Sequence, residues 1–130
     1  MNKQTLAQRA AEIMQREDQV SRWLGMRLQE VRPGHVRMSM RVTDNMVNGQ
    51  KICHGGLIFT LADTSFGFAC NTHNQRAVAA SCSIDFLAPA HEVARAGRSA
   101  VYDVRVTNQR AELIALFRGK SATVKGNWIE

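Results

Sequence analysis

The segment that most constrains the fold is an apolar stretch in the middle of the chain, GGLIFTLADTSFGFACN (55–71). It is too long for one strand, and it is long enough for a helix of about four turns. Apolar side chains occur on nearly every side of such a helix, so other elements must enclose it. The sequence therefore predicts a buried central helix.

Strand patterns follow and precede this segment. Apolar and polar residues alternate over 36–42, 78–86 and 102–106, and a further strand is expected over 113–124 after a turn at Asn108-Gln109. Residues 44–54 contain Asn48-Gly49 and are expected to form a loop. Since connections of hairpin length join the last strands, the sequence predicts an α+β fold, with an antiparallel β-sheet wrapped around one long central helix.

The N-terminal segment predicts a further helix. Apolar residues recur at helical spacing over 4–20, and we expect residues 1–22 to form a helical flank outside the core. The 130 residues leave room for a single domain, 1–130. No apolar run approaches the ~18–20 residues of a membrane span, and the N-terminus is polar, so we expect a cytoplasmic protein without membrane contact.

Charge and cysteine usage narrow the function classes. The formal net charge is +6, but the 13 arginines among the 17 basic residues are scattered, with few aromatics between them. This distribution disfavours nucleic-acid binding and is compatible with a small polyanionic ligand. The three cysteines form no CxxC pair and no metal-ligand spacing. We expect them to be small buried hydrophobic residues, with no metal site.

Asp63 is the first candidate for chemistry, because it is the one acid in the apolar helix. A buried carboxylate is costly unless it is paired or functional. An Asp at such a position can also face a narrow strip of solvent or bind a backbone group, and both interpretations stay open.

The second candidate is the start of the helix, His54-Gly55-Gly56. Unpaired backbone N–H groups at a helix N-terminus suit a carbonyl oxygen that becomes an oxyanion, and glycine lets a ligand approach closely. The same residues are also compatible with an ordinary helix start. Gly55 and Asp63 are separated by about 12 Å along the helix axis, so one helix cannot supply both groups to one carbonyl. A site that uses both would be shared between two subunits of a dimer.

Three neighbouring side chains complete the candidate site. Asn48 and His54 could orient water or a substrate carbonyl, although a turn residue and a helix-capping or packing histidine are equally compatible with the sequence. Thr64 could bind the attacking water or the carboxylate, although hydrogen bonding to the preceding helical turn is common for threonine.

The segments NGQKICHGGLIFTLADTSFGFACN, SCSIDFLAPAHE and YDVRVTNQRAELIALFRGKS resemble a hotdog-fold acyl-CoA thioesterase of the PaaI type, a family associated with phenylacetate degradation. The resemblance covers most of the chain. It implies a hotdog fold, dimers that pair into tetramers, and hydrolysis of phenylacetyl-CoA or its ring-hydroxylated relatives. Coenzyme A would be part of the substrate, and no separate cofactor is implied.

The resemblance also implies residue roles. Asp63 would be the nucleophile or general base, and Gly55 would be the oxyanion donor. Gly56, the next residue, would contact the ligand. Asn48 and His54 would position substrate or water, and Thr64 would follow the acid as in the family pattern. Possible phosphate contacts are Arg32, Arg76, Arg118 and Lys120, although a solvated basic surface is the more common role of any one of them.

One region departs from the family pattern, because residues between 89 and 101 are fewer than expected by about one strand. We interpret this as an omitted segment, the alternative being a truncated sheet with an exposed edge. Other functions also stay open: a thioesterase for other small acyl-CoA esters, a hotdog dehydratase acting on acyl-carrier thioesters, or an acyl-CoA binding module without catalysis.

Overall fold

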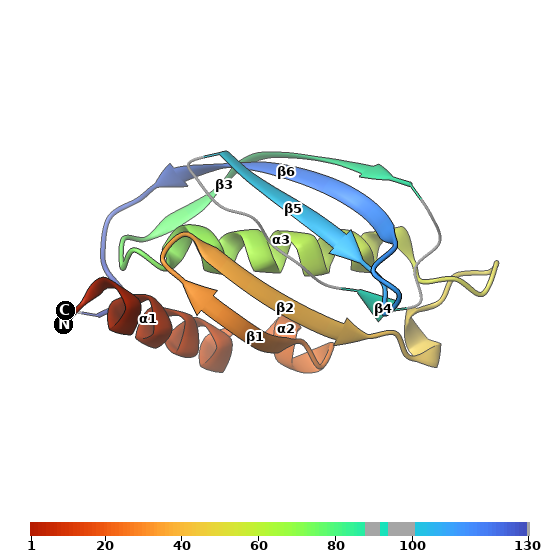
Figure 1. Cartoon of the computed structure of the whole chain (residues 1–130), viewed down its shortest axis with the longest axis horizontal. Coiled ribbons are helices and arrows are strands. Elements are labelled where there is room, and N and C mark those ends of the chain that lie inside the picture. Colours follow the sequence, from red (N-terminus) through yellow and green to blue (C-terminus); the bar gives the residue numbers. More distant parts are fainter. Residues whose placement is uncertain (88–91, 94–100, 130) are drawn as a thin grey trace.

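The computed structural model describes residues 1–87, 92–93 and 101–129. Figure 1 shows strands that curve around one long helix, α3. The strands form two antiparallel groups in the orders β1-β2-β4 and β3-β6-β5. The elements are α1 (Lys3–Glu17), α2 (Gln19–Trp23), β1 (Arg27–Arg32), β2 (His35–Arg41), the 3-10 turn η1 (Asp44–Met46), α3 (Gly55–Asn71), β3 (Ala77–Phe86), β4 (Glu92–Val93), β5 (Val101–Thr107) and β6 (Leu113–Thr123). The predicted antiparallel sheet around a central helix is therefore confirmed.

The central helix has the predicted bounds and is enclosed along most of its length. Phe66 is fully buried and lies between Tyr102 and Phe117, with ring centroids 5.4 and 5.8 Å away. Glycine at position 119 of β6 leaves room for this ring, since a Cβ there would lie 2.7 Å from it. This close packing fixes the rotation of α3 beneath the sheet and so fixes which residues face outwards.

The N-terminal region differs from the prediction in two respects. The helix expected over 4–20 ends at Glu17, because Asp18 leaves the helical conformation and its side chain caps α2 by accepting from the Ser21 amide at 3.0 Å. It also does not remain outside the core, because Ala7 and Ala11 are fully buried in the core cluster. Small side chains allow α1 to pack closely against β1 and α3.

Strand β1 is an element that the sequence pattern did not reveal. Its register with β2 shifts between Leu28 and Glu30, which places one extra residue in β1. This β-bulge lets both Leu28 and Val31 pack towards the core although they are three residues apart. Strict alternation is therefore lost at this position.

The strand β3 lies at the edge of its group, and its outer edge has no neighbour among the described strands. Most of its side chains are exposed, including Val78 and Phe86, each of which is 52% exposed. Within the described chain, no helix is both long enough and apolar enough to span a membrane. The prediction of an omitted strand concerns residues 89–101, which lie outside the described residues except for β4 and Val101.

Candidate active site

The N-terminus of α3 presents one backbone donor without an internal partner. The imidazole Nδ1 of His54 accepts from the Gly56 amide at 3.0 Å and so caps the helix. Among the described residues, no acceptor hydrogen-bonds to the Gly55 amide. The helix dipole makes such a free N–H a favourable donor to an oxyanion. The capping that the sequence left open for His54 is thus present.

The side chain that packs against Gly55 comes from the end of β3. A Cβ at position 55 would lie 3.2 Å from the ring of Phe86, so the ring lies close against Gly55, and a larger residue there requires this half-exposed ring to shift by a few tenths of an ångström. The ring is half exposed and gives the helix start an apolar neighbour. The resulting environment combines one polar donor with an exposed aromatic surface.

Asp63 lies farther along α3, where the helix passes under the middle of β3. It is half-buried, and its Oδ1 is 4.0 Å from the Sγ of Cys82. Burial raises the pKa of the Asp63 carboxyl, and the negative charge of Asp18 raises it further. No described Lys, Arg or His forms an ion pair with it. A carboxylate in this state is a stronger base and a better nucleophile than a fully solvated one.

One chain does not bring these two groups together. Gly55 lies beside Phe86 at the end of β3, whereas Asp63 lies beside Cys82, four residues earlier in the strand. This agrees with the separation of about 12 Å expected along the helix axis. Both groups nevertheless lie along the exposed edge strand β3.

Comparison with known proteins now identifies the family. Residues 50–115 match the thioesterase superfamily. The chain is 39% identical over 126 residues to the acyl-coenzyme A thioesterase PaaI of Escherichia coli K12, covering 89% of this chain and 90% of the relative. The chain belongs to the thioesterase superfamily. The predicted enzyme class is therefore confirmed as well.

Solved structures support the same assignment. The E. coli PaaI protein from the phenylacetic acid degradation operon superposes with a TM-score of 0.91 at 35% identity, covering 97% of this chain and 99% of that chain. A Streptococcus mutans protein bound to acetyl CoA, smu.793, superposes with a TM-score of 0.72 at 26% identity, covering 78% and 90% of the two chains. The hotdog fold implied by the resemblance is therefore confirmed.

Two other candidate residues of this thioesterase have the following contacts. The Oδ1 of Asn48 accepts from the amides of Gln50 and Ile52 at 2.9 and 3.4 Å, which stabilises the turn before α3. Thr64 makes no hydrogen bond to another described side chain or carbonyl, whereas Thr60 and Ser65 both donate to the preceding helical turn. The Thr64 hydroxyl is thus available to another acceptor. The catalytic roles of Asn48 and Thr64 stay predictions.

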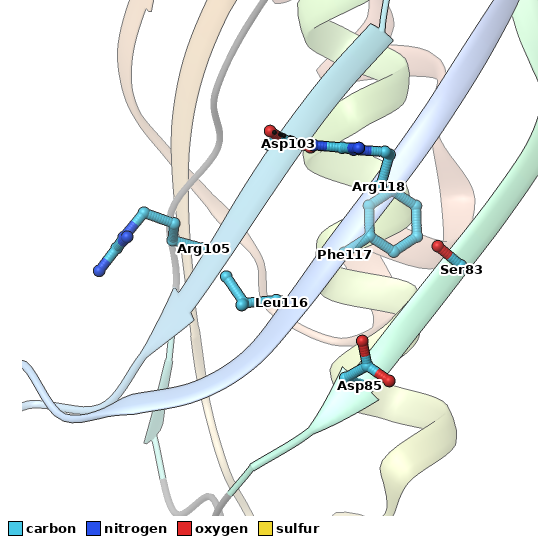
Figure 2. Close-up of a pocket in the computed structure, with 7 residues that line it drawn as sticks. All are labelled: Ser83, Asp85, Asp103, Arg105, Leu116, Phe117 and Arg118. Carbon is cyan, nitrogen blue, oxygen red and sulfur yellow. Dashed lines mark hydrogen bonds and ion pairs between the residues drawn. The ribbon is translucent and has the colours of Figure 1, made fainter.

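The basic residues proposed for phosphate binding are mostly engaged in the folded chain. Arg118 forms a two-pronged ion pair with Asp103 at 2.7 and 3.1 Å, on the outer face of the β3-β6-β5 group (Figure 2). Arg32 pairs with Glu30 at 3.0 Å, and Arg76 lies over the ring of Trp128 at 4.0 Å. Only Lys120 of the four has no such contact among the described residues.

Sequence reasoning missed the surroundings of Asp63. Cys82 was expected to be buried, but it is exposed, because β3 is an edge strand with no neighbour on its outer side among the described strands. Cys53 and Cys70 are buried as predicted, and burial raises the pKa of Cys70 to about 11. Alternation along β3 indicated that Cys82 faces the helix. Only the register between β3 and α3 shows that it faces Asp63.

Proposed function

We propose that the protein hydrolyses phenylacetyl-CoA, or a ring-hydroxylated relative, to the free acid and CoA, in the degradation of phenylacetate in the cytoplasm. The observation that carries this proposal is the free Gly55 amide at the start of the same helix that holds the half-buried Asp63. The name and operon of the E. coli relative support the aryl-acetyl substrate. The exposed ring of Phe86 beside Gly55 offers an apolar contact to an aryl group.

The proposed site lies between two subunits. The outer edge of β3 has no partner among the described strands, and a second copy of the same strand can pair with its backbone groups about a twofold axis. Asp63 lies beside Cys82 and Gly55 lies beside Phe86. Pairing Phe86 with Cys82 of the partner subunit would therefore bring Gly55 to Asp63 of the partner subunit, and the axis would pass Ile84. We further propose that two such dimers form a homotetramer.

The reaction follows from these placements. The thioester carbonyl accepts from the Gly55 amide, which stabilises the negative charge that develops on its oxygen. Asp63 of the partner subunit either attacks the carbonyl carbon or removes a proton from an attacking water. The carbon–sulfur bond then breaks, and the departing CoA thiolate takes up the proton that the water gives up. In the direct attack this water hydrolyses the acyl-aspartyl anhydride, so either route consumes one water for each acid released. Asn48 and His54 position water or substrate, and Thr64 supports the attacking group.

The proposed activity is tested by measuring thiol release from phenylacetyl-CoA, hydroxyphenylacetyl-CoA and acetyl-CoA. We expect the aryl esters to have the highest kcat/KM, and Asp63→Asn to lower it by roughly 100-fold or more without a change in oligomer size. A preference for acetyl-CoA would instead indicate a thioesterase for small acyl groups. Tight CoA-ester binding without turnover would indicate a binding module and refute the enzyme mechanism.

The proposed subunit contact is tested separately. Ile84→Cys places two thiols across the expected axis, close enough for a disulfide if Ile84 pairs with its own copy. We expect mild oxidation to give a covalent dimer on a non-reducing gel. Val78→Cys, on the same exposed strand but away from the axis, is the matched control. Equal cross-linking of both variants, or a monomer in solution, would contradict the proposed register.

A further inference from the structure

The outer face of β1 and β2 carries four arginines. Register places Arg27 and Arg37 of this pair of strands on the face away from α3, together with Arg32 and Arg41. Among the residues of β1 and β2 on this face, Glu30 is the only carboxylate, and it lies 3.0 Å from Arg32 and 3.8 Å from Arg37. In the neighbouring strand β4, Glu92 is the register partner of Arg41. The Nε of Arg37 is buried and has no acceptor among the described residues. This face therefore has an excess of donors that carry positive charge.

Part of this face forms a hollow that contains the two remaining arginines. Arg27 and Arg41 flank Ser39, whose Oγ accepts from the Nε2 of Gln29 at 2.8 Å. Neither arginine forms an ion pair with a described carboxylate. The hollow has a volume of about 280 Å³ and is completed by Gly25 and the backbone near Met40. Two guanidinium groups that have no ion pair within the described part of the chain, beside an amide and a hydroxyl, suit phosphate oxygens.

The hollow on the other group of strands shows a different balance. There, Asp85 and Asp103 lie with Arg105 and Arg118 around Leu116 (Figure 2). Because acidic and basic side chains are equal in number in that hollow, it has no comparable preference for an anion. The contrast singles out the β1–β2 hollow as the more favourable place for a polyanion.

The β1–β2 hollow also lies at the same end of the molecule as the candidate active site. Strand β1 begins and β2 ends at the end where α3 begins (Figure 1). The chain runs from Arg41 through η1 to His54, and the His54 amide donates to the carbonyl of Met46 at 2.8 Å. A long ligand could therefore contact Arg41 and reach the Gly55 amide from one end of the fold.

We propose that Arg27 and Arg41, with Gln29 and Ser39, bind the phosphates of the nucleotide end of CoA while the acyl end lies at Gly55. This inference rests on the proposed acyl-CoA substrate. Arg27 and Arg41 would then be the principal phosphate contacts, in place of Arg32, Arg76 and Arg118. The side chains of those three residues already have partners. Coenzyme A carries a diphosphate and a 3′-phosphate, which match a pair of arginines better than a single cation does.

The experiment measures calorimetric binding of CoA and of adenosine 3′,5′-bisphosphate to the wild type and to the double variant R27Q/R41Q. We expect the double variant to bind both ligands about 10- to 100-fold more weakly, as for the loss of charge-assisted hydrogen bonds. The control R9Q/R16Q removes the same charge from exposed positions of α1. It should bind like the wild type.

Turnover provides a second measurement. In R27Q/R41Q we expect KM for the acyl-CoA to rise while kcat stays close to that of the wild type. Hydrolysis of the corresponding N-acetylcysteamine thioester, which has no phosphate, should be unchanged. Loss of that activity too would show that the substitutions disturb the fold or the catalytic groups, and would overturn the assignment.

The outcomes separate this inference from the proposed function. If the wild type binds CoA and R27Q/R41Q does not, but no thioester is hydrolysed, the phosphate site stands and the enzyme mechanism fails. If thioesters are hydrolysed and R27Q/R41Q binds CoA like the wild type, the phosphate site is wrong. Equal weakening in R9Q/R16Q would show a general effect of net charge and would also overturn it.

Discussion

Two Gly→Ala substitutions test how α3 is held against the sheet. In Gly119→Ala, the new Cβ would lie 2.7–2.9 Å from three atoms of the Phe66 ring. The ring cannot retreat easily, because it is fully buried between Tyr102 and Phe117. In Gly67→Ala, one residue along α3 from Phe66, the Cβ would meet nothing within 4 Å. The same chemical change is therefore expected to have opposite effects at the two positions.

The magnitudes follow from the packing. Overpacking costs about 1–3 kcal/mol, and the lower entropy of the unfolded chain offsets roughly 0.5–1 kcal/mol of this, which leaves a net loss of about 0–2.5 kcal/mol. Because three atoms of a fully buried ring lie within 2.9 Å of the new Cβ, we expect G119A to fall in the upper part of this range, at about 1–2 kcal/mol. G67A should gain roughly 0.5–1 kcal/mol, because alanine is the better helix residue. For a chain of this length each kcal/mol corresponds to about 4 °C in Tm.

Urea unfolding at one fixed protein concentration measures both effects. In a Phe66→Leu background the ring is absent, so G119A should cost less there than in the wild type. An unchanged or raised stability of G119A, or an equal cost in both backgrounds, would refute the close packing between β6 and α3. Asp63 lies one turn before Phe66 on the same helix. Such a result would therefore also contradict the helix rotation that directs the Asp63 carboxylate towards β3.

Three further predictions concern the site. Asp63→Asn should raise stability at neutral pH, because the folded-state pKa of Asp63 is raised: stability is lost as pH rises through that pKa, and the variant lacks this loss. Urea unfolding at several pH values checks this. The difference in the free energy of unfolding between the variant and the wild type should shrink below the ordinary pKa of a carboxyl, and a difference that stays constant there would contradict the prediction. Asp18→Asn retains the cap of α2 but removes a negative charge that raises the pKa of Asp63. The acidic limb of the pH profile of kcat/KM should therefore move to lower pH. An acidic limb at the wild-type pH would exclude the charge interaction between Asp18 and Asp63. His54→Ala should lose about 0.5–2 kcal/mol with the helix cap, whereas His54→Asn should keep most of the stability. Thermal unfolding distinguishes the two variants, and equal losses would show that the cap contributes little.

The central helix was predictable because two signals agree there. Its length and apolar composition require burial, and the His54-Gly55-Gly56 sequence marks its start. The strands β2, β3 and β5 were predictable from alternation, and β6 from the turn at Asn108-Gln109 that precedes it. These signals are local, so they need no knowledge of tertiary packing.

The features that escaped prediction depend on exceptions to local rules. The bulge in β1 places Leu28 and Val31 on one face at a spacing that alternation does not allow. Asp18 ends α1 although the apolar spacing continues to Val20, because its side chain caps the following helix. Both cases require the hydrogen-bond geometry of a single position.

The site was only partly predictable for a different reason. The chemistry of Asp63 and of the Gly55 amide follows from residue type and position in one helix. The neighbours of these groups, Cys82, Phe86 and Asp18, come from other elements. Their contacts depend on strand register and on the packing of the helices, which sequence spacing does not encode.

The most direct test of the shared site uses two inactive variants in one assembly. Asp63→Asn removes the carboxylate, and Gly55→Pro removes the amide donor at the first helical position, where proline is tolerated. Each variant alone should release almost no CoA thiol. Mixed subunits at equal amounts should recover about one quarter of the wild-type rate, because half of the dimers are mixed and each has one intact site. No recovery in confirmed mixed dimers, or full activity of either single variant, would contradict a site built from Gly55 of one subunit and Asp63 of the other.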